Sequence, residues 1–541
     1  MNSSVSGLAD VIGSGVDGLV PGWFLNAAER GNAFTTLDSR HVDGLAWSTG
    51  NQVRSLVHGA AYFRVLLSAI EAMGAGDMLM FTDWRGDPDE LLAGPGTEVG
   101  SVLAAAARRG VDVRGLIWRS HWDRFHFSAD ANRHLGAEIE AAGGECLLDM
   151  RVRPMGSHHQ KLVVLRHRLQ PEKDIAFIGG IDLCHSRHDD VQHRGDPRAQ
   201  KMATAYGPRP PWHDIQLAIQ GPAVGDAETV FRERWEDPAP LSRNPIHLIG
   251  ERLHREDTTA QALPKQLPDP EPRGNQAVQL LRTYPTRRPG YPFAPDGERS
   301  VARGYRKAVA QARSLIYLED QYLWSTDVAK VFADALDRQP TLRLVALIPR
   351  FPDQDGRTAV PPNLLGREPA LRMLRQAGGS RFAVYFPENA EGTPIYVHAK
   401  VCVIDDVWGC VGSDNANRRS WTHDSELSCS VLDVPVVGDD RPGDSWARSL
   451  RLELAREHLG RALSPAETSD PVRSFDAFTD SADRLEAWSH SARTEPRPPG
   501  QLRPYTQPEL SPLPRLWATP MYRLLFDPDG RSRKMRRTRS Y

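Results

Sequence analysis

Residues 396–426 read YVHAKVCVIDDVWGCVGSDNANRRSWTHDSE. Apolar residues on either side of the Asp405-Asp406 pair predict two short strands around a turn, and a Gly-containing segment then leads into a polar loop. His398 and Lys400 are two positions apart, so on a strand their side chains leave from the same face. The stretch therefore sets an imidazole beside an ammonium group.

An earlier stretch repeats these features in the same order. Residues 157–183 read SHHQKLVVLRHRLQPEKDIAFIGGIDL, where His159 and Lys161 have the same spacing, an apolar run follows, and a Gly179-Gly180 turn comes later. Two such segments brought face to face would set two imidazoles and two ammonium groups around one point. That arrangement suits a phosphodiester, because negative charge is spread over its oxygens in the transition state.

Helix and strand patterns also repeat along the chain. In the first half a helical pattern runs to about residue 73, an apolar strand covers 78–81, and a helix and a strand fill 102–118. In the second half we expect helices over 305–312 and 328–336 and strands over 314–318 and 342–348. The sequence therefore predicts an α/β fold of two duplicated lobes.

Composition divides the chain into five parts. Residues 1–40 form a polar, Gly-rich segment that we expect to pack loosely or to cap a domain, and residues 41–236 and 299–470 are the two lobes. The Pro-rich residues 237–298 are expected to be a connector wrapped on the surface. Residues 471–541 form a C-terminal extension ending in RSRKMRRTRSY, which we expect to be a disordered solvated tail, a weak attachment to anionic lipid, or both.

Charge and cysteine content exclude several classes of protein. A net charge of −2 over 541 residues and a pI near 6.8 give no basic field of the kind that a general nucleic-acid-binding protein carries. The five cysteines show no CxxC pair, so we expect reduced core residues. With no evident secretory signal and no apolar run long enough to span a bilayer, we expect a cytoplasmic protein, with signal-independent export left open.

These motifs and their flanks resemble the phospholipase D superfamily. The pattern His-x-Lys-x-x-x-x-Asp is complete in the later copy as His398, Lys400 and Asp405. The phrases GGIDLCHSRHDD (179–190), PWHDIQLAIQGPA (211–223) and YLEDQYL (317–323) are similar to the eukaryotic-type branch. The resemblance covers residues 40–235 and 295–435 approximately. It implies a duplicated α/β fold with mixed sheets flanked by helices, in which a pseudo-two-fold axis relates the lobes and they share one active site.

The resemblance also implies roles for individual residues. Attack on phosphorus is assigned to His159 and acid/base catalysis to His398, an order that the sequence alone does not settle. Positive charge for the phosphate comes from Lys161 and Lys400. The resemblance further implies that Asn415 and Asp182 bind the phosphate. It implies that Asp214 orients His398 and Glu426 orients His159, with Asp189 or Asp190 as substitutes for Asp214. The implied structural motif residues are Gly179, Gly180, Asp405, Gly412 and Ser413.

The first motif departs from the family pattern at one position. Arg166 stands seven residues after His159, where the pattern expects Asp. Because that Asp stabilises a turn in the family, its loss affects the geometry of the first loop more than the type of reaction. Asp174 lies later in a lengthened loop and is a candidate for the same role.

The resemblance implies hydrolysis of the distal phosphodiester bond of glycerophospholipids, for example phosphatidylcholine to phosphatidic acid and choline, through a phosphohistidine. A nuclease of the same superfamily and a catalytically silent phosphoester-binding scaffold, suggested by Arg166, are the alternatives. No cofactor and no metal are expected, because the histidines at 158–159 and 185–193 are not at zinc spacings. We expect a monomer that binds phospholipid rather than nucleic acid, with peripheral membrane contact.

Five tryptophans lie in expected loops or at strand ends. Their side chains would either anchor the loops in the core or shelter acyl chains. They are Trp84, Trp118, Trp122, Trp324 and Trp421.

Overall fold

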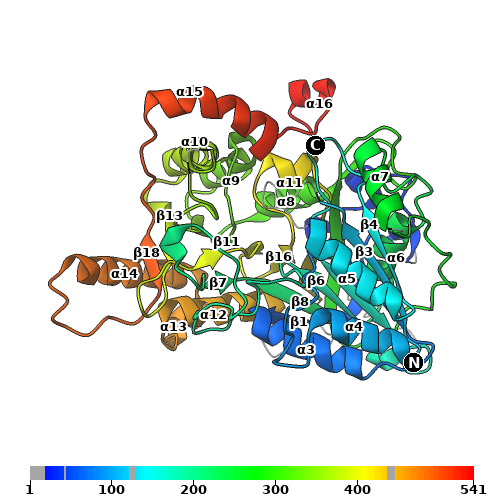
Figure 1. The fold of residues 1–541 in the computed structure, drawn as a ribbon. Helices are drawn as coiled ribbons and strands as arrows, with labels where there is room; N and C mark the ends of the chain where they lie inside the picture. Colours follow the sequence, from blue (N-terminus) through cyan, green and yellow to red (C-terminus); the bar gives the residue numbers. More distant parts are fainter. Residues whose placement is uncertain (1–18, 42–43, 121–128, 255, 357, 435–444) are drawn as a thin grey trace, which may run out of the picture.

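One mixed sheet of 16 strands organises the part of the chain that this computed structural model describes, residues 19–41, 44–120, 129–254, 256–356, 358–434 and 445–541 (Figure 1). Seven strands come from the first half. From the centre of the sheet outward they are β1 (Ser48–Val57), β8 (Ile215–Gln220), β6 (Ile175–Gly179), β5 (Leu162–Arg166), β2 (Met78–Asp83), β3 (Asp112–Trp118) and β4 (Glu145–Asp149). The outer three are parallel to one another, whereas β5, β6, β8 and β1 pair in antiparallel fashion.

The second half repeats this order on the other side of the centre. Its strands, from the centre outward, are β9 (Gln276–Tyr284), β17 (Glu426–Asp433), β16 (Trp408–Gly412), β15 (Val401–Ile404), β11 (Leu315–Glu319), β12 (Arg343–Leu347) and β13 (Phe382–Pro387). At the centre β1 and β9 pair antiparallel, with Ser48 opposite Val278. The matching orders and the antiparallel central pair confirm a duplicated α/β fold with pseudo-two-fold symmetry.

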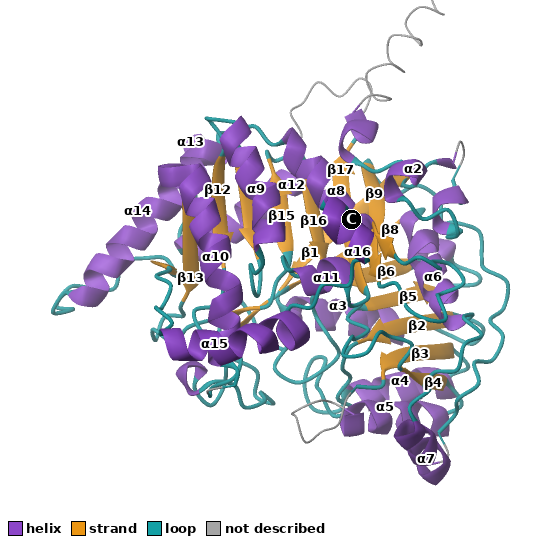
Figure 2. Ribbon diagram, turned by 90° about the horizontal axis from the view of Figure 1, so that it is seen from above, coloured by secondary structure: helices purple, strands orange, loops and turns teal. Residues whose placement is uncertain are grey.

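Helices cover both faces of the sheet, because the strands are apolar on both sides (Figure 2). On one face, α6 (Ala223–Trp235), α12 (Trp446–Leu459) and α14 (Pro471–His490) share a core that continues across both halves. The opposite face has two cores. One lies under α3 (Gly59–Glu71), α4 (Val99–Arg108) and α5 (Ala129–Ala141), and the other under α8 (Ser300–Gln311), α9 (Thr326–Arg338) and α10 (Val360–Gly378).

Residues 237–298 were expected to form a surface connector, and this expectation was wrong for the last third of the segment. Residues 276–284 form β9, which lies between β17 and β1 and is buried along almost its whole length. The run QAVQLLRTY carries enough apolar side chains to fill both faces of a central strand, and the Pro-rich segments on either side obscure it. The second half therefore begins at Gln276. Before it come α7 (Pro245–His254) and an extended segment, and after it β10 (Glu298–Arg299) pairs with β9.

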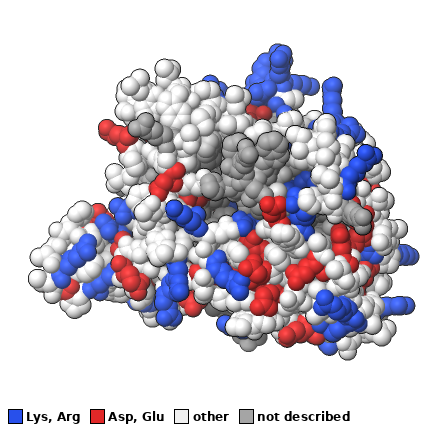
Figure 3. Space-filling model, viewed as in Figure 1, with Lys and Arg blue, Asp and Glu red and all other residues white. Residues whose placement is uncertain are grey.

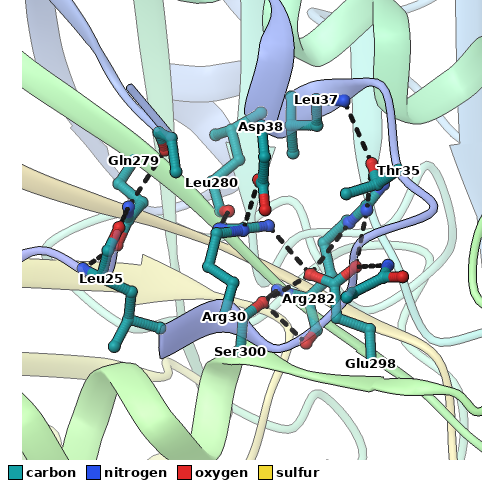
Figure 4. Close-up of polar contacts among 12 residues, drawn as sticks. Leu25, Arg30, Thr35, Leu37, Asp38, Gln279, Leu280, Arg282, Glu298 and Ser300 are labelled. Carbon is teal, nitrogen blue, oxygen red and sulfur yellow. Dashed lines mark hydrogen bonds and ion pairs between the residues drawn. The ribbon is translucent and has the colours of Figure 1, made fainter. Parts of the chain in front are cut away.

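The N-terminal segment is a tightly bonded cap over the centre of the sheet, as far as it is described (Figure 4). Arg30, at the end of α2 (Ala27–Arg30), is fully buried and pairs with Asp38 at 2.6 Å and with Glu298 at 2.8 Å. Arg282 on β9 shares Glu298 at 2.6 Å. Since these charges are buried, removal of one partner would leave another uncompensated. Residues 1–18 of the predicted segment lie outside the described part.

The C-terminal extension packs against the second half. β18 (Leu502–Pro504) adds an outer strand beside β13, followed by α15 (Pro512–Met521), a π-helical segment Tyr522–Phe526 and α16 (Arg533–Thr538); α13 (Pro465–Ser469) precedes α14. The expectation of a disordered tail was wrong. Tyr541 is buried with its ring 5.7 Å from that of Trp421, and Arg303 donates two hydrogen bonds to its main-chain carboxyl end. Each of the five cysteines is buried and free of disulfides, as predicted.

Candidate active site

Each His-x-Lys motif crosses to the other half of the molecule through main-chain hydrogen bonds. The short strands β14 (Tyr396–Val397) and β7 (Trp212–His213) pair in parallel, and the N–H of His398 donates to the carbonyl of His213 at 2.8 Å. The first motif mirrors this, since the N–H of His159 donates to the carbonyl of Ser425 at 2.9 Å. The backbone thus brings residues of both halves to one place.

The crossing pairs each imidazole with a carboxylate of the other half. Nδ1 of His398 lies 2.6 Å from Oδ2 of Asp214, and Nδ1 of His159 lies 2.9 Å from Oε2 of Glu426. When the carboxyl is deprotonated it accepts the Nδ1 proton, and Nε2 of each ring is then the nitrogen available for chemistry. His159 keeps 15 % of its side chain exposed and His398 only 6 %.

The two proposed substitutes for Asp214 lie elsewhere. Asp189 accepts the main-chain N–H of Trp212 at 2.8 Å and those of Asp190 and Gly195, so it organises the loop before β7. Asp190 accepts the N–H of Gln192. Asp214 is therefore the carboxylate that contacts His398.

The two lysines have unequal surroundings. Nζ of Lys161 lies 3.1 Å from Oδ1 of Asp182, and both side chains are 1 % exposed. Lys400 is equally buried, but its side-chain contact is the neutral Oε1 of Gln321 at 3.4 Å. Each ammonium also donates to the main-chain carbonyl of the histidine two residues before it. One half of the site thus has a paired cation, whereas no carboxylate among the described residues contacts the cation of the other half.

Asp182 and Asn415 occupy corresponding positions after β6 and β16. Asp182 pairs with Arg187 at 3.2 Å as well as with Lys161, and its charge acts on the neighbouring Asp83. Burial and the neighbouring Asp182 raise the pKa of Asp83 well above its ordinary value. Asn415 is buried, and its side-chain oxygen has no hydrogen-bond partner in the described part of the chain.

Burial dominates the protonation of the site. It lowers the pKa of both His159 and His398 well below the ordinary value, and the charges of Lys400 and Lys161 lower it further. Burial also lowers the pKa of Lys400 to about 8, although Asp214 opposes it. The pKa of Glu426 rises to about 8 because the carboxyl is desolvated and Asp424 lies near. The site thus favours neutral imidazoles when no anion is present.

The structural motif residues hold the two carboxylates close. A Cβ on Gly180 would lie 2.1 Å from Oδ1 of Asp214, and one on Gly179 would lie 2.5 Å from the carbonyl of Ile215, so neither position admits a side chain. Ser413, which corresponds to Gly180, donates from its hydroxyl to Glu426 at 2.5 Å. A Cβ on Gly412 would meet the Ser428 side chain at 2.0 Å.

Asp405 and Arg166 stand at corresponding motif positions but bond differently. The carboxylate of Asp405 accepts the main-chain N–H groups of residues 313–315 and so secures the start of β11. Arg166 instead lies in a buried ion network, 3.1 Å from Glu228 and 3.4 Å from Asp174. Asp174 accepts the N–H of His167 at 2.5 Å. The loop is therefore held by an alternative set of bonds.

Sequence reasoning missed several residues that surround the motifs. Arg187 lies 4.1 Å above the ring of Trp212, and that ring lies 4.9 Å from His398. Arg187 lies within the GGIDLCHSRHDD segment, but the spacing of residues in that segment did not predict its contact with Asp182. Of the five tryptophans, Trp118, Trp324 and Trp421 are core residues, whereas the ring of Trp84 lies 6.2 Å from that of His159. Trp122 lies outside the described residues.

A second polar cluster lies behind the strand that carries Asp214. His58, His193, His213 and Glu457 have ligand atoms within 4.8 Å of one another, an arrangement that could hold a metal ion. No metal-binding spacing along the chain predicts this cluster, because Glu457 belongs to the other half of the chain. Within the described residues, no helix has the length and apolar character needed to cross a bilayer.

Several known proteins are similar to this chain in sequence. A family model described as Phospholipase D matches residues 86–346. Phospholipase D alpha 1 of Cynara cardunculus is 25% identical over 490 residues, which cover 69% of this chain and 60% of that protein. Phospholipase D1 of Saccharomyces cerevisiae is 26% identical over 507 residues, covering 76% of this chain and 29% of that protein. The chain spans about six-tenths of the length of the first plant relatives that it matches.

Similarity in fold extends to solved structures. The crystal structure of phosphatidylserine synthase from Haemophilus influenzae superposes with a TM-score of 0.52 at 13% identity, covering 80% of this chain and 94% of that one. At this identity the likeness concerns the fold alone.

Proposed function

The chain belongs to the phospholipase D superfamily, and on that premise we propose that it is a phosphodiesterase that hydrolyses the distal phosphodiester bond of glycerophospholipids. The observation that carries the proposal is the pair of crossed contacts, His398 with Asp214 at 2.6 Å and His159 with Glu426 at 2.9 Å. Two oriented imidazoles and two lysines in one buried site supply a nucleophile, an acid and positive charge for phosphoryl transfer.

In the first step Nε2 of His159 attacks phosphorus and the bond to the head-group oxygen breaks. Neutral imidazole is required, and the lowered pKa of His159 supports this role. His398 donates the proton that the leaving oxygen needs. Because an anionic phosphate offsets the lysine charges, its binding raises the pKa of His398 toward the range where the ring is protonated.

In the second step water hydrolyses the phosphohistidine. His398, now neutral, takes a proton from water, oxygen bonds to phosphorus, and the bond from phosphorus to His159 breaks. Lys161 and Lys400 stabilise charge on the phosphoryl oxygens, and Asn415 donates from its amide. Glu426 and Asp214 hold the rings and stabilise each imidazolium as it forms. Both halves lie in one chain, so we propose the monomer as the active unit.

An apolar surface beside the site supports a lipid substrate. On α15 and the π-helical segment after it, Leu513, Leu516 and Leu524 are 79 %, 77 % and 68 % exposed. In Figure 3 the surface over α15 is largely uncharged, while basic residues gather beside it over α16. Arg419, four residues after Asn415, donates to the carbonyls of Leu525 and Met155 and so ties this surface to the site.

Such a surface has the two features of peripheral membrane binding. Exposed leucines enter the boundary of the acyl chains, and the exposed basic residues of α16 each contribute about 1 kcal/mol beside anionic lipid. We propose that this face docks on a membrane and presents the site to its substrate.

Choline release from phosphatidylcholine vesicles tests the function. We expect release by the wild-type chain and at least a ~1,000-fold loss in His159→Ala. His134→Ala removes an exposed histidine on α5 and is the matched control, with unchanged activity expected.

Plasmid and single-stranded DNA are assayed in parallel. Cleavage of DNA without choline release would replace the proposal with a nuclease. Inactivity on all three substrates would favour a phosphoester-binding scaffold. A phosphorylated enzyme trapped by denaturation at alkaline pH, where the phosphorus–nitrogen bond is stable, from His398→Asn but not from His159→Ala, would assign the nucleophile to His159.

A further inference from the structure

Three imidazoles converge on one carboxylate behind the active site. Nε2 of His58 lies 3.0 Å from Glu457, Nε2 of His193 lies 3.1 Å away, and Nδ1 of His213 lies 3.3 Å away. The histidine side chains are at most 4 % exposed and that of Glu457 is 5 % exposed. The three histidines belong to the first half of the chain and Glu457 to α12 of the second. The phosphodiesterase mechanism uses none of the four.

In two of the three rings, the nitrogen that points away from Glu457 already has a hydrogen-bond partner. That partner determines whether the nitrogen facing Glu457 carries a proton. Nδ1 of His193 lies 3.1 Å from the carbonyl of Trp212, and because a carbonyl only accepts, this nitrogen carries the proton. Nε2 of His213 lies 2.7 Å from Glu319 and donates to it in the same way. When the two rings are neutral, Nε2 of His193 and Nδ1 of His213 therefore carry a lone pair and no proton.

Both lone pairs face the same oxygen of Glu457. An acceptor aimed at a carboxylate oxygen is repulsive, and the buried Nδ1 of His213 has no hydrogen-bond partner among the described residues. A cation between the four groups turns this repulsion into coordination. The alternative is a second proton on each ring, with no ion present.

The distances agree with a metal centre. Ligands 2.0–2.1 Å from a tetrahedral zinc ion are about 3.3 Å apart, close to the separations around Glu457. Histidine ligands of metals usually donate their second N–H to a carboxylate or a main-chain carbonyl, as His213 does to Glu319 and His193 to Trp212.

The backbone at the cluster is held in an uncommon conformation. His58 and His193 have φ of 68° and 51°, values that residues other than glycine seldom adopt, so the surrounding structure must hold them there. A cavity of about 490 Å³ opens beside His58 and Glu457, lined also by Val57, Ala60 and Arg64, and gives an ion a path to the cluster.

We propose that His58, His193, His213 and Glu457 bind one zinc ion, which clamps the two halves of the molecule together. The site is closed, with four protein ligands and no position for substrate, so its role is structural. Its position links it to the active site, because His213 precedes Asp214 in the chain and the N–H of His58 donates to the carbonyl of Asp214 at 2.9 Å. The ion thereby positions the carboxylate that orients His398.

Metal analysis of the untagged full-length chain tests the proposal. After incubation with Zn²⁺ and removal of the excess, we expect about one tightly held zinc per chain, and chelation should lower the Tm by about 5 °C or more. X-ray absorption at the zinc edge should show nitrogen and oxygen ligands and no sulfur, which separates this site from binding by the buried cysteines.

Two variants assign the ligands. Glu457→Gln keeps the size of the side chain and should lose the zinc, whereas His458→Gln changes a neighbouring histidine that contacts Glu319 and should retain it. If Glu457→Gln does not fold, the zinc content and absorption spectrum of the wild-type chain still decide. Wild-type protein that binds no zinc and has the same Tm with Zn²⁺ or chelator would overturn the proposal. Loss of zinc in His458→Gln would overturn the assignment of ligands.

Discussion

Lys400 holds a positive charge in a buried place where no carboxylate of the described residues contacts it, and the free energy of this arrangement is measurable. Burial lowers its pKa from 10.5 to about 8. Each pKa unit corresponds to about 1.4 kcal/mol, so the charge destabilises the folded state by about 3 kcal/mol at neutral pH. Replacing Lys400 with Met, which has a similar shape and no charge, removes this cost. We therefore expect Lys400→Met to be more stable than wild type while losing catalytic activity.

The sign of the pH dependence follows from the direction of the shift. Below about pH 8 the lysine is protonated in both folded and unfolded chains, so the full cost is present. Between pH 8 and 10.5 the unfolded chain binds more protons than the folded one, and the stability of the wild type rises with pH. The advantage of Lys400→Met should thus be greatest at or below about pH 8 and disappear as pH approaches 10.5.

Thermal unfolding provides the assay. With about 2.1 cal/mol/K of unfolding entropy per residue, 541 residues convert 3 kcal/mol into a Tm rise of about 3 °C near neutral pH. Lys161→Met is the matched control. Because Lys161 contacts the buried Asp182 at 3.1 Å, its removal leaves a carboxylate with less compensation and should lower the Tm. An unchanged or lower Tm for Lys400→Met near neutral pH would refute the reasoning, as would an advantage that persists at pH 10.5.

Three further outcomes are expected. Gly180→Ala should reduce activity in the choline-release assay at least ~100-fold, because the added Cβ would lie 2.1 Å from Asp214 and displace it. Its control, Gly74→Ala, should keep full activity, because nothing lies within 4 Å of the added Cβ. Arg166→Asp, which restores the family residue, should cost about 3–5 kcal/mol in denaturant unfolding because it removes a buried cation that Glu228 and Asp174 share and adds a third carboxylate beside them, although Glu228 keeps Arg232; stability equal to wild type would contradict this account. Leu516→Asp should weaken sedimentation with anionic vesicles yet leave hydrolysis of a soluble short-chain phospholipid unchanged, and equal loss on both substrates would argue against a docking role.

Several features were predictable from local patterns. The spacing of His398 and Lys400 sets both side chains on one face of a strand whatever the rest of the fold, and the earlier motif obeys the same rule. The repeated order of helices and strands likewise follows from periodicities within short windows. By contrast, β9 was hidden because Pro-rich flanks dominate its window, although its apolar residues are those of a central strand.

The docked C-terminus shows a different limit. RSRKMRRTRSY has the composition of a solvated tail, and its arginines and lysine on α16 are indeed exposed. Arg531 and Tyr541, however, find partners at Asp327 and Trp421, more than a hundred residues earlier in the chain. Such distant contact partners cannot be predicted from the composition of a segment.

By itself the sequence determined the duplicated α/β lobes, the two His-x-Lys motifs and the kind of chemistry they suit, because residue type and short-range spacing specify which faces are buried. Only the tertiary structure decided the inequality of Lys161 and Lys400 and the meeting of His58 with Glu457, which are 399 residues apart. The physical reason is that desolvation and charge pairing depend on what the opposite half of the molecule brings to the same place. Proximity of that kind arises when the two halves pack across β1 and β9.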